Sequence, residues 1–194
     1  MEFFTADIHL GHHRLLEYER GDDFKTVEEC DEYMLQQWNK KVTRKDTVYI
    51  IGDVSMTNSK YTIAWLNKAN GKKILIKGNH DKKMNGLVRD CFQAIYDFGK
   101  EINIRLSDDT KKKVVLCHYA LKVWNRSHYG SWHLYGHSHG NLVDAPNERS
   151  WDVGMDNNRY EVLSVPDLEE IMSKKLPHIP IDHHAKWQGK EDDK

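Results

Sequence analysis

Two histidines lie two residues apart in Gly136-His137-Ser138-His139, directly after the short apolar run 132–135. If that run is a β-strand, side chains two positions apart point to the same side of it. As the strand ends, both imidazoles can reach one place, and neutral imidazole is the commonest metal ligand among side chains. The spacing therefore indicates a metal site, although one core histidine and one surface histidine would give the same pattern.

An apolar run followed by a side chain that can bind a metal recurs at four other places. These runs end at Asp7 and His9, at Asp53, at Asn79 and His80, and at His118. Together these carboxylate, amide and imidazole groups offer more ligands than one cation needs, so the set predicts two divalent cations. Such a centre keeps a net positive charge beside its two Asp ligands, which attracts phosphate and stabilises charge that develops during its displacement.

The elements that position these residues begin as alternating strands and helices. Strands are predicted at 2–6, 47–51 and 74–76, and helices at 14–20, 26–42, about 60–69 and about 84–91. The helix over 26–42 begins with a capping box, Thr26-Val27-Glu28-Glu29. Such alternation is typical of βαβ units, in which the site lies outside the carboxyl ends of the strands. That rule brings the polar strand ends together.

The second half of the chain departs from this alternation. Strands over 93–98 and 101–106 are predicted to be joined by a tight turn at Gly99-Lys100, and Lys111-Lys112-Lys113 is predicted to be a solvated turn before a strand over 114–117. The last strands are expected at 132–135, 151–155 and 160–165, the final two joined near 156–158. A helix then begins at Pro166-Asp167.

The domain prediction is a single unit over residues 1–176, followed by a partly disordered C-terminal tail over 177–194. The tail contains His183-His184, which we interpret as a solvated pair and not as metal ligands. The chain has 194 residues, of which 39% are hydrophobic, so it can bury a sizeable core.

Composition excludes several other classes of protein. The formal net charge is −1, so no global field draws the chain to nucleic acid or to an anionic membrane. The three cysteines, Cys30, Cys91 and Cys117, are too widely spaced for a disulfide framework or a Cys-x-x-Cys site. Residues 1–7 lack the basic region and long apolar stretch of a signal peptide, and no apolar run reaches membrane-spanning length, so we expect neither a signal peptide nor a membrane helix. We therefore expect a cytoplasmic protein with no membrane partner.

The combined motifs resemble those of the calcineurin-like metallophosphoesterases. The family blocks Asp-x-His, Gly-Asp, Gly-Asn-His-Asp/Glu, His and Gly-His-x-His are here Asp7-Ile8-His9, Gly52-Asp53, Gly78-Asn79-His80-Asp81, His118 and Gly136-His137-Ser138-His139. The resemblance covers residues 1 to about 175, and the early helix and the stretch 124–130 look like those of compact bacterial and phage members. It implies an α/β fold, a four-layer α/β/β/α sandwich of two mixed sheets flanked by helices.

The resemblance also divides the ligands between two divalent metal ions. It implies that one ion is held by Asp7, His9 and His139, the other by Asn79, His118 and His137, and that Asp53 bridges them. His80 would face the substrate with its side chain pointing away from the ligands, and Asp81 would orient it. Without a thiolate the set fits Mn, with Fe or Zn as alternatives.

Two departures from the family concern the substrate. Many relatives carry Gly-Asp-x-x-Asp-Arg, whereas Gly52-Asp53 here continues into Val54-Ser55-Met56-Thr57, and Lys77 stands where protein phosphatases have Arg. Arg is the better bidentate partner for a terminal phosphate. We therefore favour hydrolysis of a phosphodiester by a metal-bridging hydroxide, with His80 as the general acid.

Alternative functions stay open at this point. They are a phosphomonoesterase acting on nucleotides or phosphoproteins, and a non-catalytic scaffold on the same fold. The expected partner is a small phosphorylated or nucleotide substrate; a nucleic acid is an alternative, although no basic stripe supports one. His12, Trp124 and Arg126 are candidates for contacting the substrate. The alternatives are that His12 makes a hydrogen bond within its loop, that Trp124 is a packed aromatic and that Arg126 is a surface charge. The oligomeric state is not predicted.

Overall fold

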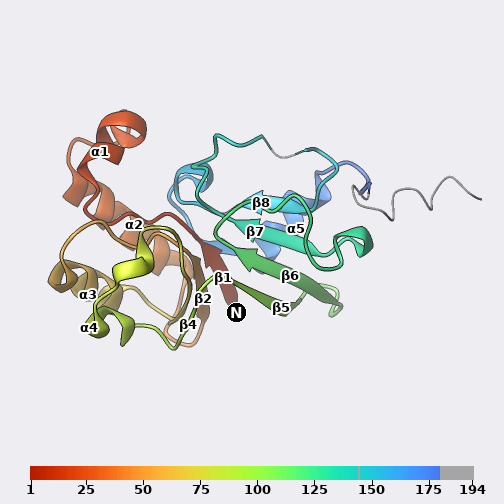
Figure 1. The fold of residues 1–194 in the computed structure, drawn as a ribbon, viewed down its shortest axis with the longest axis horizontal. Helices are drawn as coiled ribbons and strands as arrows, with labels where there is room; N and C mark the ends of the chain where they lie inside the picture. The colour runs from red at the N-terminus through yellow and green to blue at the C-terminus, as the bar shows by residue number, and fades with distance from the viewer. Residues whose placement is uncertain (144, 180–194) are drawn as a thin grey trace, which may run out of the picture.

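Two β-sheets form the centre of this computed structural model, which describes residues 1–143 and 145–179 apart from the side chain of Lys83 (Figure 1). The larger sheet contains β1 (Glu2–Thr5), β2 (Thr47–Ile51), β3 (Lys72–Ile76), β4 (Ala94–Tyr96) and β9 (Leu163–Ser164). The smaller sheet contains β5 (Gly99–Arg105), β6 (Lys111–Cys117), β7 (Trp132–Tyr135) and β8 (Ser150–Asp152). Most of the predicted tail, including His183-His184, lies outside the described residues.

Both sheets are mixed. In the larger sheet, ordered β4-β3-β2-β1-β9, the first four strands are parallel and β9 is antiparallel to β1. In the smaller sheet, ordered β5-β6-β7-β8, β5 is antiparallel to β6 and the other pairs are parallel. The predicted α/β sandwich of two mixed sheets flanked by helices is confirmed.

The helices lie close to the predicted positions. They are α1 (His13–Leu15), α2 (Val27–Lys41), α3 (Ser59–Lys68), α4 (Gly86–Arg89) and α5 (Val165–Ser173), and a π-helical turn over Leu16–Arg20 continues α1. Thr26 caps α2 by accepting the Glu29 N–H, but the Glu29 carboxylate accepts the Lys25 N–H, so the reciprocal half of the capping box is shifted by one residue. Within the described residues, no helix has both the length and the apolar character needed to cross a membrane.

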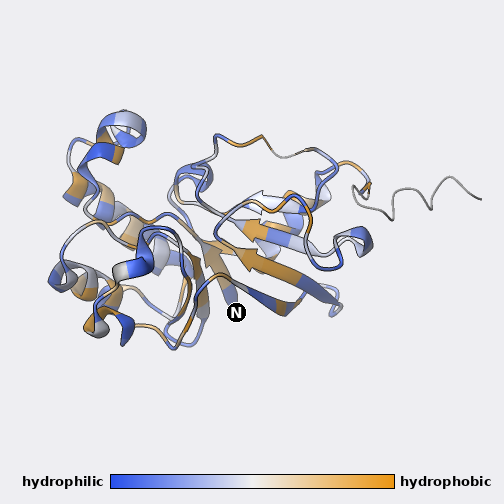
Figure 2. Ribbon diagram, in the orientation of Figure 1, coloured by the Kyte–Doolittle hydropathy of each residue, from blue (hydrophilic) through white to orange (hydrophobic). Residues whose placement is uncertain are grey.

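Alternating residues of the central strands face two hydrophobic cores. In β1, Phe3 packs into a core with residues of α2 and α3, including Trp38 and Trp65, whereas Phe4 faces the core that also contains Leu116 and Leu134 of the smaller sheet. Figure 2 shows the carboxyl-terminal part of β6, Val114–Cys117, coloured as hydrophobic. Helix α5 adds Val165, Leu168 and Met172 to this second core. Packing on both faces holds the carboxyl ends of the central strands in fixed positions.

Three local predictions are wrong. Strands β4 and β5 do not form a hairpin, since they belong to different sheets and Gly99-Lys100 lies inside β5. Strands β8 and β9 are likewise in different sheets. Lys111-Lys112-Lys113 is the first part of β6, where it pairs with Asn103–Arg105 of β5. Strands that are adjacent in sequence were expected to pair within one sheet. Instead, the two strands of each pair lie in different sheets, on opposite sides of the hydrophobic core between the sheets.

The first turn of α5 gives a prediction on pH dependence. Asp167 accepts hydrogen bonds from the backbone N–H and the hydroxyl of Ser164, and it pairs with Lys41. Burial acts in the opposite direction, but these groups hold the pKa of Asp167 below its usual value. Because the folded-state pKa is lowered, the carboxylate stabilises the fold above its unfolded-state pKa of about 3.9. That contribution disappears as the pH falls through the folded-state pKa.

We therefore expect Asp167→Asn to lower the melting temperature at pH 7, with the difference from wild type shrinking below about pH 4. Thermal unfolding of both proteins between pH 7 and pH 3 measures this difference. Asp109→Asn, at an exposed turn, serves as the control and should leave the melting temperature nearly unchanged. A difference that stays constant over the pH range would contradict the assigned role of the Asp167 charge.

Candidate metal centre

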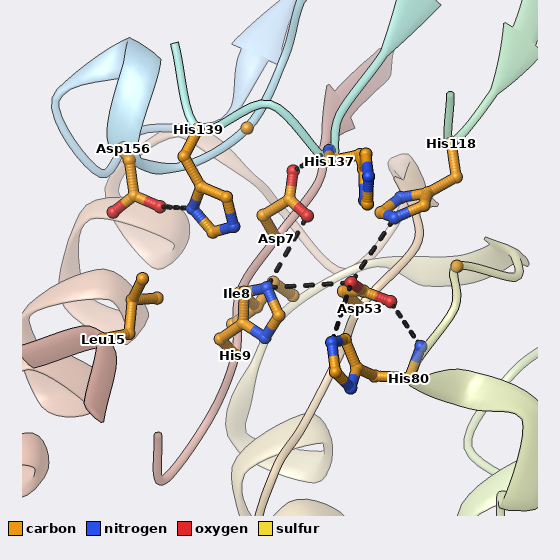
Figure 3. A network of polar contacts seen from close by, with 12 residues as sticks. Asp7, Ile8, His9, Leu15, Asp53, His80, His118, His137, His139 and Asp156 are labelled. Carbon is orange, nitrogen blue, oxygen red and sulfur yellow. Dashed lines mark hydrogen bonds and ion pairs between the residues drawn. The ribbon is translucent and has the colours of Figure 1, made fainter. Parts of the chain in front are cut away.

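The ends of five strands meet at one place, as Figure 3 shows. Asp7 and His9 follow β1, Asp53 follows β2, and Asn79 and His80 follow β3 of the larger sheet, while His118 follows β6 and His137 and His139 follow β7 of the smaller sheet. Hydrogen bonds across the intersheet boundary connect these ends: the Asp7 carboxylate accepts the His137 N–H at 2.7 Å, and His118 Nδ1 lies 2.8 Å from the Ile51 carbonyl. The two sheets thus contribute to a single cluster.

The backbone at this cluster is unusual. Asp7, His9, Asp53, His137 and His139 all have positive φ, between 48° and 70°. Few residues other than glycine adopt this left-handed conformation, and it is found preferentially at functional sites, where the surrounding structure must enforce it. The conformation turns each residue sharply out of its strand, so that its side chain points into the common centre.

Two glycines permit the close approach of these loops. A Cβ at Gly52, whose φ is +91°, would collide with the His118 imidazole, and a Cβ at Gly136 would collide with Asp7 and Ala6. Glycine is therefore required at these positions because no side chain fits between the loops.

The first cluster consists of Asp7, His9 and His139, whose potential ligand atoms lie within 4.8 Å of one another. Asp7 Oδ1 and His9 Nδ1 are buried and have no hydrogen-bond partner among the described residues. Burial raises the pKa of Asp7 to about 7 and lowers that of His9. Buried polar atoms normally have partners, so the Asp7 oxygen left without one, 3.7 Å from His9 Nε2, fits a cation ligated at this place.

The second cluster consists of Asp53, His118 and His137, again within 4.8 Å, and Asn79 lies beside it in contact with His118. His118 Nδ1 lies 2.8 Å from the Ile51 carbonyl, which can only accept, so this nitrogen carries a hydrogen. In the neutral ring, Nε2 then presents a lone pair toward Asn79 Oδ1 at 3.0 Å and Asp53 Oδ2 at 3.4 Å. Three electron-pair donors facing one another fit a bound cation.

Asp53 lies between the two clusters. Its Oδ2 is 3.8 Å from His9 Nε2 and 3.4 Å from His118 Nε2, which belong to different clusters. Its Oδ1 accepts the backbone N–H of His80 at 2.9 Å. Burial opposes it, but the neighbouring His118 and this N–H hold the pKa of Asp53 low, so the carboxylate is ionised. An ionised carboxylate in this position can serve two cations at once.

The predictions for His80 and Asp81 need correction. The His80 imidazole does not point away from the ligands: its Nε2 is 4.0 Å from Asp53 Oδ2, and it borders the cluster from the solvent side, with 42% of the side chain exposed. Asp81 is buried and accepts the backbone N–H groups of Asp53, Val54 and Gly78. It therefore fixes the two loops that carry Asp53 and Asn79 and does not orient the His80 ring.

The three candidates for substrate contact separate clearly. His12 lies at the rim, where its ring is 5.3 Å from that of His9 and its Nδ1 caps α1. Trp124 is buried and donates its indole N–H to Ser131, so it is a packed aromatic. Arg126 lies near the amino-terminal ends of β6 and β7, beside Lys111 and Ser131, which is the far end from the cluster. The structure brings neither Trp124 nor Arg126 to the site.

Sequence reasoning missed two charged residues next to the first cluster. Asp156 Oδ2 lies 2.7 Å from His139 Nδ1, and the buried Arg20 binds both oxygens of Asp156. Burial opposes it, but these contacts hold the pKa of Asp156 at about 2 and raise that of His139 to about 8. Asp156 directly follows the strand predicted over 151–155, which is a local signal, but it belongs to none of the family motifs, and Arg20 has no local signal of this kind.

Known proteins match most of the length of this chain. The chain is 26% identical over 179 residues to an uncharacterized protein of Methanocaldococcus jannaschii, covering 89% of this chain and 91% of that protein. It is 25% identical to the Gene 66 protein of Mycobacterium phage D29, covering 88% and 95% of the two chains. A protein of unknown function from Aquifex aeolicus has a similar fold, with a TM-score of 0.66, 21% identity, and coverage of 88% of this chain and 98% of that one.

The family comparison covers nearly the whole sequence. The family model described as calcineurin-like phosphoesterase matches residues 3–193. The matched region contains every strand end at the cluster described above, together with both groups of His and Asp residues that can hold a metal ion. The chain therefore belongs to the family of calcineurin-like phosphoesterases.

Proposed function

We propose that this protein is a dinuclear metal-dependent phosphodiesterase. The observation that carries the proposal is the position of Asp53 between two groups of ligands, one formed with His9 and the other with His118. Asp7, His9 and His139 would hold one ion, Asn79, His118 and His137 the other, and Asp53 both. We propose Mn as the metal, with Fe and Zn as alternatives that a set without thiolates fits equally well.

Bound divalent cations supply two things to such a reaction: a water of lowered pKa as nucleophile, and polarisation of the phosphoryl oxygens. The protein supplies position. The left-handed backbone at Asp7, Asp53 and His137 and the Asp81 hydrogen bonds hold the ligands before a substrate arrives. A preorganised site of this kind needs little reorganisation as charge develops.

His80 is the group placed to serve the leaving side of the reaction. Its imidazole is partly exposed, lies at the rim of the cluster, and is not one of the grouped ligands. It also borders a cleft of about 120 Å³ whose lining includes Ser55, Thr57 and Ser59. We propose that the leaving alkoxide of a small phosphorylated or nucleotide substrate lies on this side and takes its proton from His80.

The surroundings of the site favour a diester over a monoester. Lys77 is turned to Asp97, with Nζ and Oδ1 2.7 Å apart. Met56-Thr57 stands where many relatives carry Asp-Arg. These residues do not provide the bidentate guanidinium grip that suits the second charge of a terminal phosphate. A diester carries a single negative charge and does not need that grip.

The cysteines bear on the location that we propose. Cys30, Cys91 and Cys117 are free thiols, and two of them are buried. Free cysteines are usual where thiols are kept reduced. We propose a cytoplasmic location on this ground.

The substrate class can be tested with a matched pair of aryl esters. At equal Mn²⁺ loading, bis-nitrophenyl phosphate should show a higher kcat/KM than nitrophenyl phosphate. The monoester carries a second negative charge, and the site lacks the guanidinium that would bind it. Lys77→Arg is the informative variant, since it restores the family residue and should raise kcat/KM for the monoester more than for the diester. A wild-type preference for the monoester would instead favour a phosphomonoesterase, and no turnover of either ester would support a scaffold.

A further inference from the structure

A buried arginine, Arg20, connects the segment that follows β1 to the segment that follows β8. Arg20 has only 3% of its surface exposed. Its Nη2 donates to the Asp7 carbonyl at 2.9 Å and its Nη1 donates to the Ile8 carbonyl at 3.1 Å. Its Nε and Nη2 also donate to the two oxygens of Asp156, at 2.6 and 3.0 Å. A buried guanidinium is tolerated only when its charge and donors are satisfied, and Asp156 and the two carbonyls do this.

The connection continues from Asp156 to a histidine of the first cluster. Asp156 Oδ2 accepts the hydrogen of His139 Nδ1 at 2.7 Å, as Figure 3 shows. With Nδ1 used in this way, the neutral ring presents its Nε2 lone pair on the opposite side, toward Asp7 and His9. Carboxylates commonly fix the tautomer and the orientation of a metal-binding histidine from behind in this manner.

An alternative use of the same residues is a third cation site. Glu19, His139 and Asp156 also form a group whose potential ligand atoms lie within 4.8 Å. However, both Asp156 oxygens already accept N–H groups, and the Arg20 guanidinium beside them is positively charged. A divalent cation there would be repelled by Arg20 and would have to displace His139. The geometry therefore favours support of His139 over a site of its own.

We propose that Arg20 and Asp156 are positioning residues that fix His139 and the Asp7-Ile8 backbone for one of the two metal ions. This inference rests on the proposed dinuclear centre. Arg20 holds the backbone that carries one ligand and, through Asp156, the side chain of another. The buried Arg20 guanidinium thus sets the distance between two ligands, Asp7 and His139, that come from different sheets.

The test compares Mn²⁺ binding in two backgrounds by isothermal titration calorimetry. His137→Ala should disrupt the site that contains His137 and leave the Mn²⁺ site that contains His139. Adding Asp156→Asn to this variant should lower the Mn²⁺ affinity of the remaining site about 10–100-fold. His139→Ala should leave the other site, and there Asp156→Asn should have no effect. Arg20→Lys keeps the charge but loses the planar fork, and it should act in the same background and in the same direction. Asp167→Asn, which changes a cation-paired carboxylate in the first turn of α5, is the matched control and should leave both affinities unchanged.

The outcomes separate the two proposals. If the wild-type protein binds no Mn²⁺, the dinuclear centre itself is wrong. If the wild-type protein binds two ions but Asp156→Asn lowers the Mn²⁺ affinity equally in both backgrounds, or in neither, the positioning role is wrong and the dinuclear centre stands. Three bound ions, of which Asp156→Asn removes one, would identify a third cation site. Should Asp156→Asn fail to fold by circular dichroism, Arg20→Lys decides the question by the same comparison.

Discussion

Asp53→Asn should abolish phosphoester hydrolysis and weaken both metal sites together. The reason is the position of this carboxylate, whose Oδ2 lies 3.8 Å from His9 Nε2 and 3.4 Å from His118 Nε2. Asparagine keeps the shape and one oxygen but removes the negative charge that two cations would share. Elemental analysis after Mn²⁺ loading should give about two ions per wild-type chain and fewer than one in the variant.

The control for this experiment is Asp109→Asn at an exposed turn, which should keep both ions and full activity. Circular dichroism and thermal unfolding in EDTA establish that each variant folds without metal. A wild-type protein that binds one ion tightly, with activity unchanged when more Mn²⁺ is added, would rule out the two-metal proposal. Loss of a single ion in Asp53→Asn would mean that this carboxylate serves one site only.

His80→Ala should retain the fold and both metal ions but lose most of its activity on substrates with poor leaving groups. The His80 side chain is partly exposed at the rim and outside both ligand groups, so its removal leaves the ligands intact. A general acid typically contributes about 10²–10⁴-fold in rate, or roughly 3–5 kcal/mol of barrier. We expect a loss of this size for alkyl diesters, measured as kcat under saturating Mn²⁺.

The same variant should lose much less activity on nitrophenyl esters, because a nitrophenolate leaves without needing a proton. His12→Ala is a matched control at the same rim, since it removes a second partly exposed imidazole near His9 and should not show this dependence on the leaving group. An equal loss on both substrate classes would show that His80 binds phosphate and does not donate a proton. A loss of metal in His80→Ala would make it a ligand.

The residues of the centre could be identified from the sequence because the signals that mark them are local. A buried strand is an apolar run, its end is marked by glycine, and the next side chain is Asp, Asn or His. For parallel strands of one sheet, the ends must meet at one edge. The rule groups Asp7 with Asp53 at the edge of the larger sheet and His118 with His139 at the edge of the smaller sheet, and the packing of the two sheets then brings these edges together.

The arrangement of strands in the second half was less accessible. The run 93–106 looks like a hairpin, but β4 completes the larger sheet and β5 begins the smaller one. The two strands are separated because one face of the larger sheet packs against one face of the smaller sheet. This packing involves residues that are distant in sequence. Trp124 and Arg126, the candidates for substrate contact, lie away from the cluster for a related reason. They are near the ligands in sequence, but β7 runs between them and His137, so they lie at opposite ends of that strand.

The sequence by itself determined the chemical groups, their order and the glycines that let their loops approach. Tertiary structure alone decided which side chains support them. Arg20 and Asp156 are 136 residues apart and follow no shared pattern, yet they meet behind His139. Asp81 looks like a partner of its neighbour His80, but it turns inward to the backbone of Asp53 and Val54. The physical reason is that a buried charge takes whichever donors the packed core brings to it, and only the folded chain defines those donors.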